Sequence, residues 1–492
     1  MISRRDLLTT AGAGLGASLR GQERSSRFLG LMVLPEYVQV EGIDRVLANL
    51  QRAGATAVST SPYLMAPAHE KDGSREPPID AGAGTVRLLD RPLWGRRELF
   101  VRTGPAFTPD ARLYAGLRYQ PPPPNDLTRR EPTLIRDFIR AARSAGLKVY
   151  FQVQAAIPPG YRVQFGGPRE EDIPRLPDGR VPPRRLANNA SLAATHVRAY
   201  TEALIRDLCR AYPEIHGIRV DWPEYPPYLL DDVFLDFSEP ARAAAARLGF
   251  DFARMRADAL SAYRQLHGGL SNAQLEAWCE EDGGLYAFLT ALADRPGLLE
   301  LMRFKAALAE ETVAGYRRAL TAAGGGDKEL LPNAFPPPFS FVSGMDYARV
   351  GQYSQGISVK LYTMHWPVIL RFYADALMAA NRGLSEALLV RALVRLTDTA
   401  EEPKPRVADY RYPEPGEPHP VSLAAQARKI RQARRRAGGA LIYALAHGYG
   451  PVDDAARRAR AVYLASGRKL WVNRYGYLSD AKLDALKTAC GG

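Results

Sequence analysis

The chain has 492 residues, of which 46% are hydrophobic and 24% charged. That is enough to bury a large core, either in about two to three domains or in one elaborated barrel. The formal net charge is +13, and much of it comes from arginines scattered along expected helices. The densest basic run, residues 427–436, could form a nucleic-acid or anionic-surface patch. Such a run is more often the solvated face of a helix, so we expect no nucleic-acid partner.

Cysteine and histidine patterns do not support a disulfide framework or a metal site. The three cysteines, Cys209, Cys279 and Cys490, lie far apart, are odd in number and form no CxxC pair. The seven histidines show no ligand spacing, and the HExxH motif is absent. We therefore expect no metal and no cofactor. We also expect no obligate protein partner.

The first residues predict export. Residues 3–8, Ser-Arg-Arg-Asp-Leu-Leu, precede a short run rich in Gly and Ala and resemble a twin-arginine signal. The apolar run is too short to form a stable membrane anchor. A disordered basic tail is the alternative interpretation. The resemblance predicts a signal peptide over residues 1–22 and a periplasmic or secreted protein.

Apolar segments and helical periodicity alternate along the rest of the chain. Eight segments are predicted as buried strands: residues 27–37, 55–63, 147–155, 215–221, 328–335, 356–364, 439–450 and 469–479. Helical segments follow them at residues 42–54, 132–146, 191–213, 368–396, 421–437, 453–467 and 480–489. Two further stretches, residues 64–131 and 231–324, are predicted as insertions; the first is rich in Pro and Gly and the second in helix.

Eight repeats of strand and helix predict the fold class α/β, as a single (β/α)8 barrel over residues 27–490 with these two long insertions. Parallel strands joined by right-handed crossovers would produce this order. An open doubly wound sheet is the alternative, but no GxGxxG motif follows the first strand.

In such a barrel, functional residues gather where the strands end. The strand ends here combine carboxylates, amides and aromatic rings, which is the mixture that sugar binding needs. The predicted substrate-binding residues are Glu36, Tyr63, Gln152, Gln154, Arg219, Trp222, Asn333, Lys360, Tyr362, His365, Trp366 and His447. Trp366 is as readily a core residue as a sugar platform.

The segment from His216 to Tyr228 contains the predicted catalytic residues. Asp221 ends a buried strand, and Arg219 lies two residues earlier on the same side, where it would orient the carboxylate. Glu224 follows among Pro and aromatic residues, whose burial would raise its pKa as a general acid requires. Asp221 could instead only cap a loop or pair with Arg219, and Glu224 could bind a hydroxyl or point away. Glu36 and then Asp346 are the next candidates for the second carboxylate.

The motif Gly-Ile-Arg-Val-Asp, residues 217–221, is similar to the fourth-strand motif of the α-amylase superfamily, in which the Arg supports a nucleophilic Asp. The ends of strands five and seven depart from that superfamily's pattern. Residues 221–228, Asp-Trp-Pro-Glu-Tyr-Pro-Pro-Tyr, resemble a segment of bacterial glycoside-hydrolase-like barrels, as do residues 360–366 and 473–479. This resemblance implies a barrel that acts on carbohydrate.

We therefore expect an exported hydrolase of O-glycosidic bonds acting on an oligo- or polysaccharide, with Asp221 and Glu224 as its carboxylate pair. A non-catalytic sugar-binding protein on a degenerate glycosidase barrel is the main alternative. A barrel enzyme acting on phosphorylated or other small anions is a second alternative, and it predicts an anion site after strands seven and eight.

Overall fold

A computed structural model describes residues 27–79, 87–280, 284–399 and 403–491. The predicted signal peptide, residues 1–22, lies outside the described residues. Within these ranges, no helix has both the length and the apolar character needed to cross a membrane.

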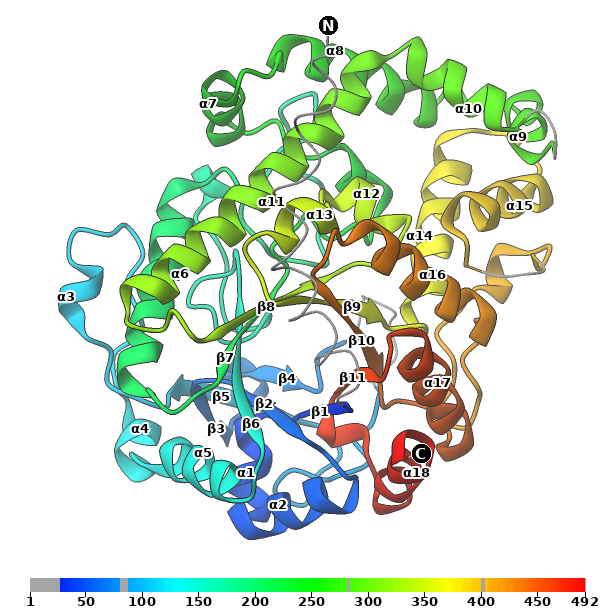
Figure 1. Cartoon of the computed structure of the whole chain (residues 1–492). Coiled ribbons are helices and arrows are strands. Elements are labelled where there is room, and N and C mark those ends of the chain that lie inside the picture. Colours follow the sequence, from blue (N-terminus) through cyan, green and yellow to red (C-terminus); the bar gives the residue numbers. More distant parts are fainter. Residues whose placement is uncertain (1–26, 80–86, 281–283, 400–402, 492) are drawn as a thin grey trace, which may run out of the picture.

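The predicted barrel is confirmed: eight parallel strands close on themselves, and helices surround them (Figure 1). The order around the barrel is β1-β11-β10-β9-β8-β7-β6-β2. Each barrel strand therefore pairs with the barrel strand before it and the one after it in sequence, and the last, β11, pairs with β1. Their bounds are β1 Phe28–Met32, β2 Ala57–Thr60, β6 Lys148–Gln154, β7 Gly217–Asp221, β8 Glu329–Ala334, β9 Gly356–Leu361, β10 Leu441–His447 and β11 Lys469–Asn473.

Helices connect the strands on the outside of the barrel, because their apolar faces must be buried against the sheet. They are α1 Pro35–Glu41, α2 Ile43–Arg52, α5 Leu134–Ser144, α6 Thr195–Ala211, α11 Pro296–Ala322, α12 Phe339–Ser343, α13 Tyr347–Gly351, α14 His365–Ala380, α15 Glu386–Thr397, α16 Leu423–Arg436, α17 Val452–Ala465 and α18 Asp480–Gly491.

The first strand is shorter than predicted. Residues 27–37 were expected to form one strand, but β1 ends at Met32 and α1 begins at Pro35. Proline is well suited to the first turn of a helix because its missing N–H has no partner there in any case. Glu36 and Tyr37 therefore belong to a buried helix and not to a strand end.

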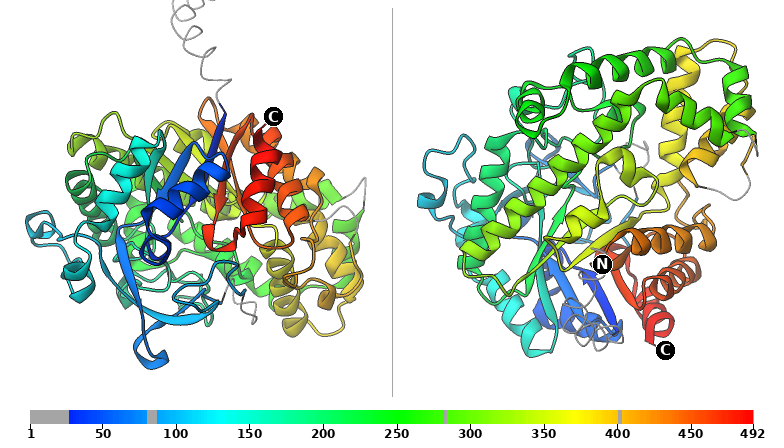
Figure 2. Two further views of the ribbon diagram at one scale, coloured as in Figure 1. Left: turned by 90° about the horizontal axis from the view of Figure 1, so that it is seen from below. Right: turned by 45° about the horizontal axis from the view of Figure 1, so that its top comes forward.

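The two insertions differ in structure. Residues 64–131 contain α3 Ala111–Tyr114, α4 Asp126–Arg130 and most of a small antiparallel sheet in the order β3-β5-β4: β3 Tyr63–Pro67, β5 Leu99–Pro105 and β4 Ser74–Glu76. Residues 231–324 contain α7 Glu239–Leu248, α8 Phe252–Leu266, α9 Asn272–Cys279 and α10 Gly284–Ala293, which extend along one side to α15 (Figures 1 and 2). The last helix of this stretch, α11, packs on α6 as a barrel helix.

The barrel interior is packed around a large aromatic side chain. The Trp471 ring is fully buried and lies against Phe28 and Tyr150. A Cβ on Gly30 would overlap this ring, so the strand beside it needs glycine. The Arg219 guanidinium lies over the same ring, 4.1 Å from its centroid.

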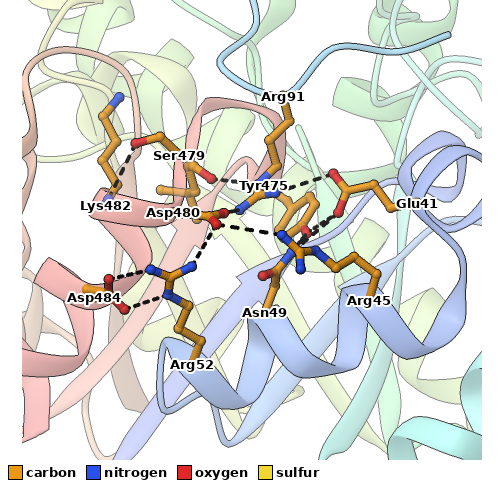
Figure 3. A network of polar contacts seen from close by, with 11 residues as sticks. Glu41, Arg45, Asn49, Arg52, Arg91, Tyr475, Ser479, Asp480, Lys482 and Asp484 are labelled. Atoms are coloured by element: carbon orange, nitrogen blue, oxygen red, sulfur yellow. Dashed lines mark hydrogen bonds and ion pairs between the residues drawn. The ribbon is translucent and has the colours of Figure 1, made fainter. Parts of the chain in front are cut away.

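A polar network holds the segment after β11 against α1 and α2 (Figure 3). Tyr475 donates from its hydroxyl to Glu41, 2.6 Å away, and accepts from Asn49 Nδ2 at 2.5 Å. Arg91 donates from Nε to the carbonyl of Leu478 at 2.7 Å and pairs through Nη2 with Asp480 at 2.6 Å. The loop that begins at Arg474 is thereby fixed at the end of the last strand.

Candidate functional site

A cavity of about 160 Å³ opens at the carboxyl ends of the barrel strands. This is the end at which barrels of this kind place their functional residues. Its walls come from strands on opposite sides of the barrel and from the loops that follow them. They consist of Met32, Leu34, Ser61, Pro78, Ile79, Arg87, Gln152, Gln154, Tyr161, Arg162, Val163, Leu186, Asp221, Trp222, Tyr228, Tyr362, His365, His447, Asn473 and Arg474.

The structure brings seven of the residues selected from sequence to this cavity: Gln152, Gln154, Asp221, Trp222, Tyr362, His365 and His447. The others lie behind its wall or farther away: Glu36, Tyr63, Arg219, Glu224, Asn333, Lys360 and Trp366. Asp221 is thus the one predicted carboxylate that faces the cavity, with 13% of its side chain exposed.

Asp221 forms an ion pair with Lys360 and not with Arg219. The Nζ atom of Lys360 lies 2.8 Å from Asp221 Oδ1. The ammonium group is almost fully buried, between the ring of Phe335 at 4.8 Å and that of Trp222 at 5.5 Å. The contact is an ion pair without hydrogen-bond geometry, and the Trp222 backbone N–H donates to the same Asp221 oxygen at 3.1 Å.

Arg219, the predicted support of Asp221, is near enough for the two charges to interact, but its hydrogen bond goes to Asn333. Arg219 is fully buried and donates from Nη2 to Asn333 Oδ1 at 3.0 Å, and Asn333 in turn donates to Gln152 at 3.3 Å. Burial lowers the pKa of Arg219 to about 10, although the nearby Tyr362 and Asp221 oppose this. Arg219 and Asn333 thus lie in the barrel interior behind the residues that line the cavity.

Glu224 is fully buried beside this pair, behind the cavity wall. Its Oε1 accepts from the N–H of Phe335 at 2.8 Å, and its Oε2 accepts from the Ser343 hydroxyl at 2.6 Å. Burial raises the pKa of Glu224 to about 7, and Lys360, with Nζ 3.9 Å from Oε1, opposes the rise. The expected direction of the pKa shift is confirmed, whereas the role as proton donor stays a prediction.

Lys360 places the two predicted catalytic carboxylates near each other. Its Nζ atom lies 2.8 Å from Asp221 Oδ1 and 3.9 Å from Glu224 Oε1, so both carboxylates lie beside the same ammonium group. Of these two carboxylates, Asp221 faces the cavity and Glu224 does not.

Glu36 belongs to a second buried cluster on the far side of the cavity wall. It accepts from the hydroxyl of Tyr63 at 3.0 Å and pairs with Arg162 at 3.1 Å. Burial raises its pKa, against the effect of Arg162. Arg162 also pairs with Glu76 at 2.8 Å, and Glu76 accepts from Arg474. Glu36 and Tyr63 therefore position Arg162, which itself lines the cavity.

Two more candidates lie away from the cavity. Trp366 is buried in the core, where the Lys429 ammonium lies 5.0 Å from its ring centroid, so the core interpretation of this residue is the one the structure bears out. Asp346 accepts from two N–H groups at the start of α13 and pairs with Arg436 at 3.1 Å. It caps a helix outside the cavity.

Sequence reasoning missed three arginines of the cavity wall: Arg87, Arg162 and Arg474. Arg87 lies in the predicted insertion, Arg162 lies between the predicted strand 147–155 and the predicted helix 191–213, and Arg474 directly follows β11. The density of arginine in those loops was the available signal. Among the described residues, no group of three or more His, Cys, Asp and Glu side chains could hold a metal ion.

Comparisons with solved structures give neighbours of low sequence identity. No protein-family model matches the chain. No curated protein matches it either. A β-galactosidase from the psychrophilic Marinomonas ef1 is 11% identical, with a TM-score of 0.49 over 94% of this chain, and the chain spans 59% of that protein's length.

Two other solved structures match over most of both chains. The catalytic domain of a β-amylase from Paenibacillus polymyxa is 10% identical, with a TM-score of 0.45 over 93% of this chain and 94% of that one. A chitinase from Chromobacterium violaceum is 9% identical, with a TM-score of 0.38 over 95% of this chain and 100% of that one. At these identities and TM-scores, no residue role follows from the similarity.

Proposed function

We propose that the protein hydrolyses O-glycosidic bonds in the cavity at the carboxyl ends of its strands. The observation that carries the proposal is Asp221, a carboxylate that faces the cavity and is held by Lys360 at 2.8 Å. The aromatic rings of Trp222 and Tyr228 and the amides of Gln152 and Gln154 surround it, as binding of a sugar ring would require.

In this mechanism Asp221 is the nucleophile or the anion that stabilises positive charge on the anomeric carbon. Lys360 keeps the carboxylate oriented and is a positioning residue. Glu224 is the proposed source of the proton for the leaving oxygen, because its pKa of about 7 keeps it partly protonated at neutral pH. To reach the substrate, its side chain must give up the hydrogen bonds from Phe335 and Ser343.

The placement of Glu224 also favours a second candidate function. Both of its oxygens are engaged and it does not line the cavity, so a sugar-binding protein on a glycosidase-like barrel would have the same arrangement. Such a protein would bind the same sugars and release no reducing ends.

The test is release of reducing sugar from a panel of polysaccharides, oligosaccharides and aryl glycosides. We compare the parent protein, Asp221→Asn and the matched control Asp346→Asn, whose carboxylate lies outside the cavity. We expect activity in the parent and the control, and a loss of several orders of magnitude in Asp221→Asn. Equal activity in all three proteins would reject Asp221, and sugar binding without hydrolysis would support the second candidate.

Export completes the proposal, on the resemblance of residues 3–8 to a twin-arginine signal. Replacing Arg4 and Arg5 by lysine should then retain the protein in the cytoplasm of the producing cell. Unchanged export of that variant would contradict the proposal.

A further inference from the structure

Arginines gather on the outer surface of two neighbouring helices, α16 and α17. The two helices pack side by side, and each ends just before a barrel strand begins, at the end of the barrel opposite the cavity (Figures 1 and 2). The exposed members, called the arginine cluster from here on, are Arg431, Arg434, Arg435, Arg457, Arg460 and Arg468. Within each helix, members three or four residues apart share one face.

Contacts at the helix ends bring the members of the cluster together. Arg434 donates from Nη1 to the carbonyl of Ala465, the last residue of α17, at 2.9 Å. Arg460 donates from Nη1 to the carbonyl of Ala489 in α18 at 3.1 Å. Arg468 lies in the turn between α17 and β11. The basic run found in the sequence, residues 427–436, is therefore one part of a surface that continues onto α17.

Carboxylates do not neutralise the cluster. No member forms an ion pair with any residue that the structure describes, whereas exposed arginines elsewhere, such as Arg52 and Arg247, do. Helix α16 contains no Asp or Glu. Of the two carboxylates in α17, Asp454 is taken by the buried Arg458 at 2.7 Å, which leaves the exposed Asp453. The face thus carries a strong excess of positive charge.

An exposed apolar side chain lies within this cationic face. Leu464 is 51% exposed and lies four residues after Arg460 and seven after Arg457, on the same side of α17. A nucleic acid or another soluble polyanion offers little to such a side chain. A lipid surface offers anionic headgroups to arginines and an acyl boundary to leucine. The combination therefore favours a lipid surface as the partner.

The chain enters the barrel beside the cluster. Arg27 is the first residue that the structure describes, and the N–H of Phe28 donates to the carbonyl of Arg468 at 3.0 Å. Residues 1–26, which include the segment that resembles a twin-arginine signal, are therefore joined to the barrel at this point. The predicted export would bring this part of the chain to a membrane.

We propose that the arginine cluster and Leu464 bind the surface of an anionic lipid bilayer, with the cavity directed away from it. The guanidinium groups contact the lipid phosphates, and Leu464 reaches the boundary of the acyl chains. The cavity opens at the other end of the barrel, so a substrate would reach it from the side away from the bilayer. This inference goes beyond the proposed glycosidase function and does not depend on it.

Vesicle binding by the full-length protein tests the inference. The protein is mixed with vesicles of phosphatidylcholine alone, or of phosphatidylcholine with about one third phosphatidylglycerol, and sedimentation gives the bound fraction. We expect binding to the anionic vesicles and little binding to the neutral ones. Salt at about 0.5 M should release the protein, because ions screen exposed charges.

A pair of variants with equal loss of charge locates the binding surface. The cluster variant carries Arg431→Gln, Arg435→Gln, Arg457→Gln and Arg468→Gln. The control carries Arg129→Gln, Arg136→Gln, Arg264→Gln and Arg382→Gln, at exposed positions outside the cluster. The net charge falls by four in each. We expect binding to anionic vesicles to weaken by at least roughly tenfold in the cluster variant and to stay close to the parent in the control.

Single substitutions test the apolar contact and stand in for the cluster variant should that protein not fold. Leu464→Gln should weaken binding to anionic vesicles by about threefold or more, because the leucine side chain is lost from the lipid boundary. Leu396→Gln is the matched control, since Leu396 is 43% exposed on α15 and lies outside the cluster.

Absence of vesicle binding, or equal binding to neutral and anionic vesicles, would overturn the inference. Unchanged binding in the cluster variant, or an equal loss in cluster variant and control, would reject the site. Binding to DNA or polygalacturonate in place of vesicles would reject the lipid partner. Glycoside hydrolysis without vesicles should be the same in parent and cluster variant, so the proposed function is tested separately.

Discussion

Replacing Glu224 by glutamine should make the protein more resistant to unfolding at alkaline pH. Burial raises the pKa of Glu224 from an ordinary value of 4.5 to about 7. Between these values the folded protein holds a proton that the unfolded chain has released, so the free energy of unfolding falls as the pH rises. At 1.36 kcal/mol per pKa unit, the cost is complete above pH 7 and amounts to about 3 kcal/mol.

Glutamine fits the hydrogen bonds that surround this position. Its carbonyl oxygen can accept from the Phe335 N–H, as Glu224 Oε1 does. Its amide nitrogen then faces Ser343, whose hydroxyl can accept from it and donate instead to the Ser340 carbonyl, 3.1 Å away. The substitution therefore removes the ionisation and keeps the shape of the site.

Urea unfolding followed by tryptophan fluorescence at pH 5 and pH 8 measures the effect. Parent and Glu224→Gln should be similar in stability at pH 5, and the variant should exceed the parent by up to about 3 kcal/mol at pH 8. Glu170→Gln serves as the control, because 84% of that side chain is exposed. The same pH dependence in all three proteins would refute the reasoning from burial.

Two further predictions concern the packing of the barrel and its closure. Gly30→Ala should lower the stability by about 1–3 kcal/mol, because its Cβ would overlap the buried Trp471 ring, whereas Gly326→Ala has open space; equal melting temperatures would contradict this. Arg91→Ala should lower the melting temperature more than Arg52→Ala, because the side chain of Arg91 is 10% exposed and that of Arg52 is 38% exposed. The reverse order would mean that burial does not decide the strength of the network in Figure 3.

The barrel could be predicted from sequence because each strand is a short apolar run between helical segments, and such local patterns survive in the fold. Its eight strands match the eight predicted segments in order. The exception near residue 35 arose because the apolar residues of α1 continue the strand pattern without a break. Only the proline marked the change.

The partner of Asp221 could not be predicted in the same way. Arg219 lies close to Asp221 in sequence, but side chains inside a barrel form layers to which alternate strands contribute. Asp221 ends β7, and Lys360 comes from β9, two strands away around the barrel. The arginines of the cavity wall come from loops far apart along the chain, so their convergence depends on the closed fold.

The path of the chain has a practical consequence. Phe28 begins β1 at the end of the barrel opposite the cavity, and its N–H donates to the carbonyl of Arg468 at the start of β11. α18 returns to the same end, where Arg27 lies close enough to the buried Cys490 thiol to influence its pKa. A support or fusion partner joined next to Arg27 or after α18 would therefore be attached at the end of the barrel opposite the cavity, and the mouth of the cavity would stay accessible.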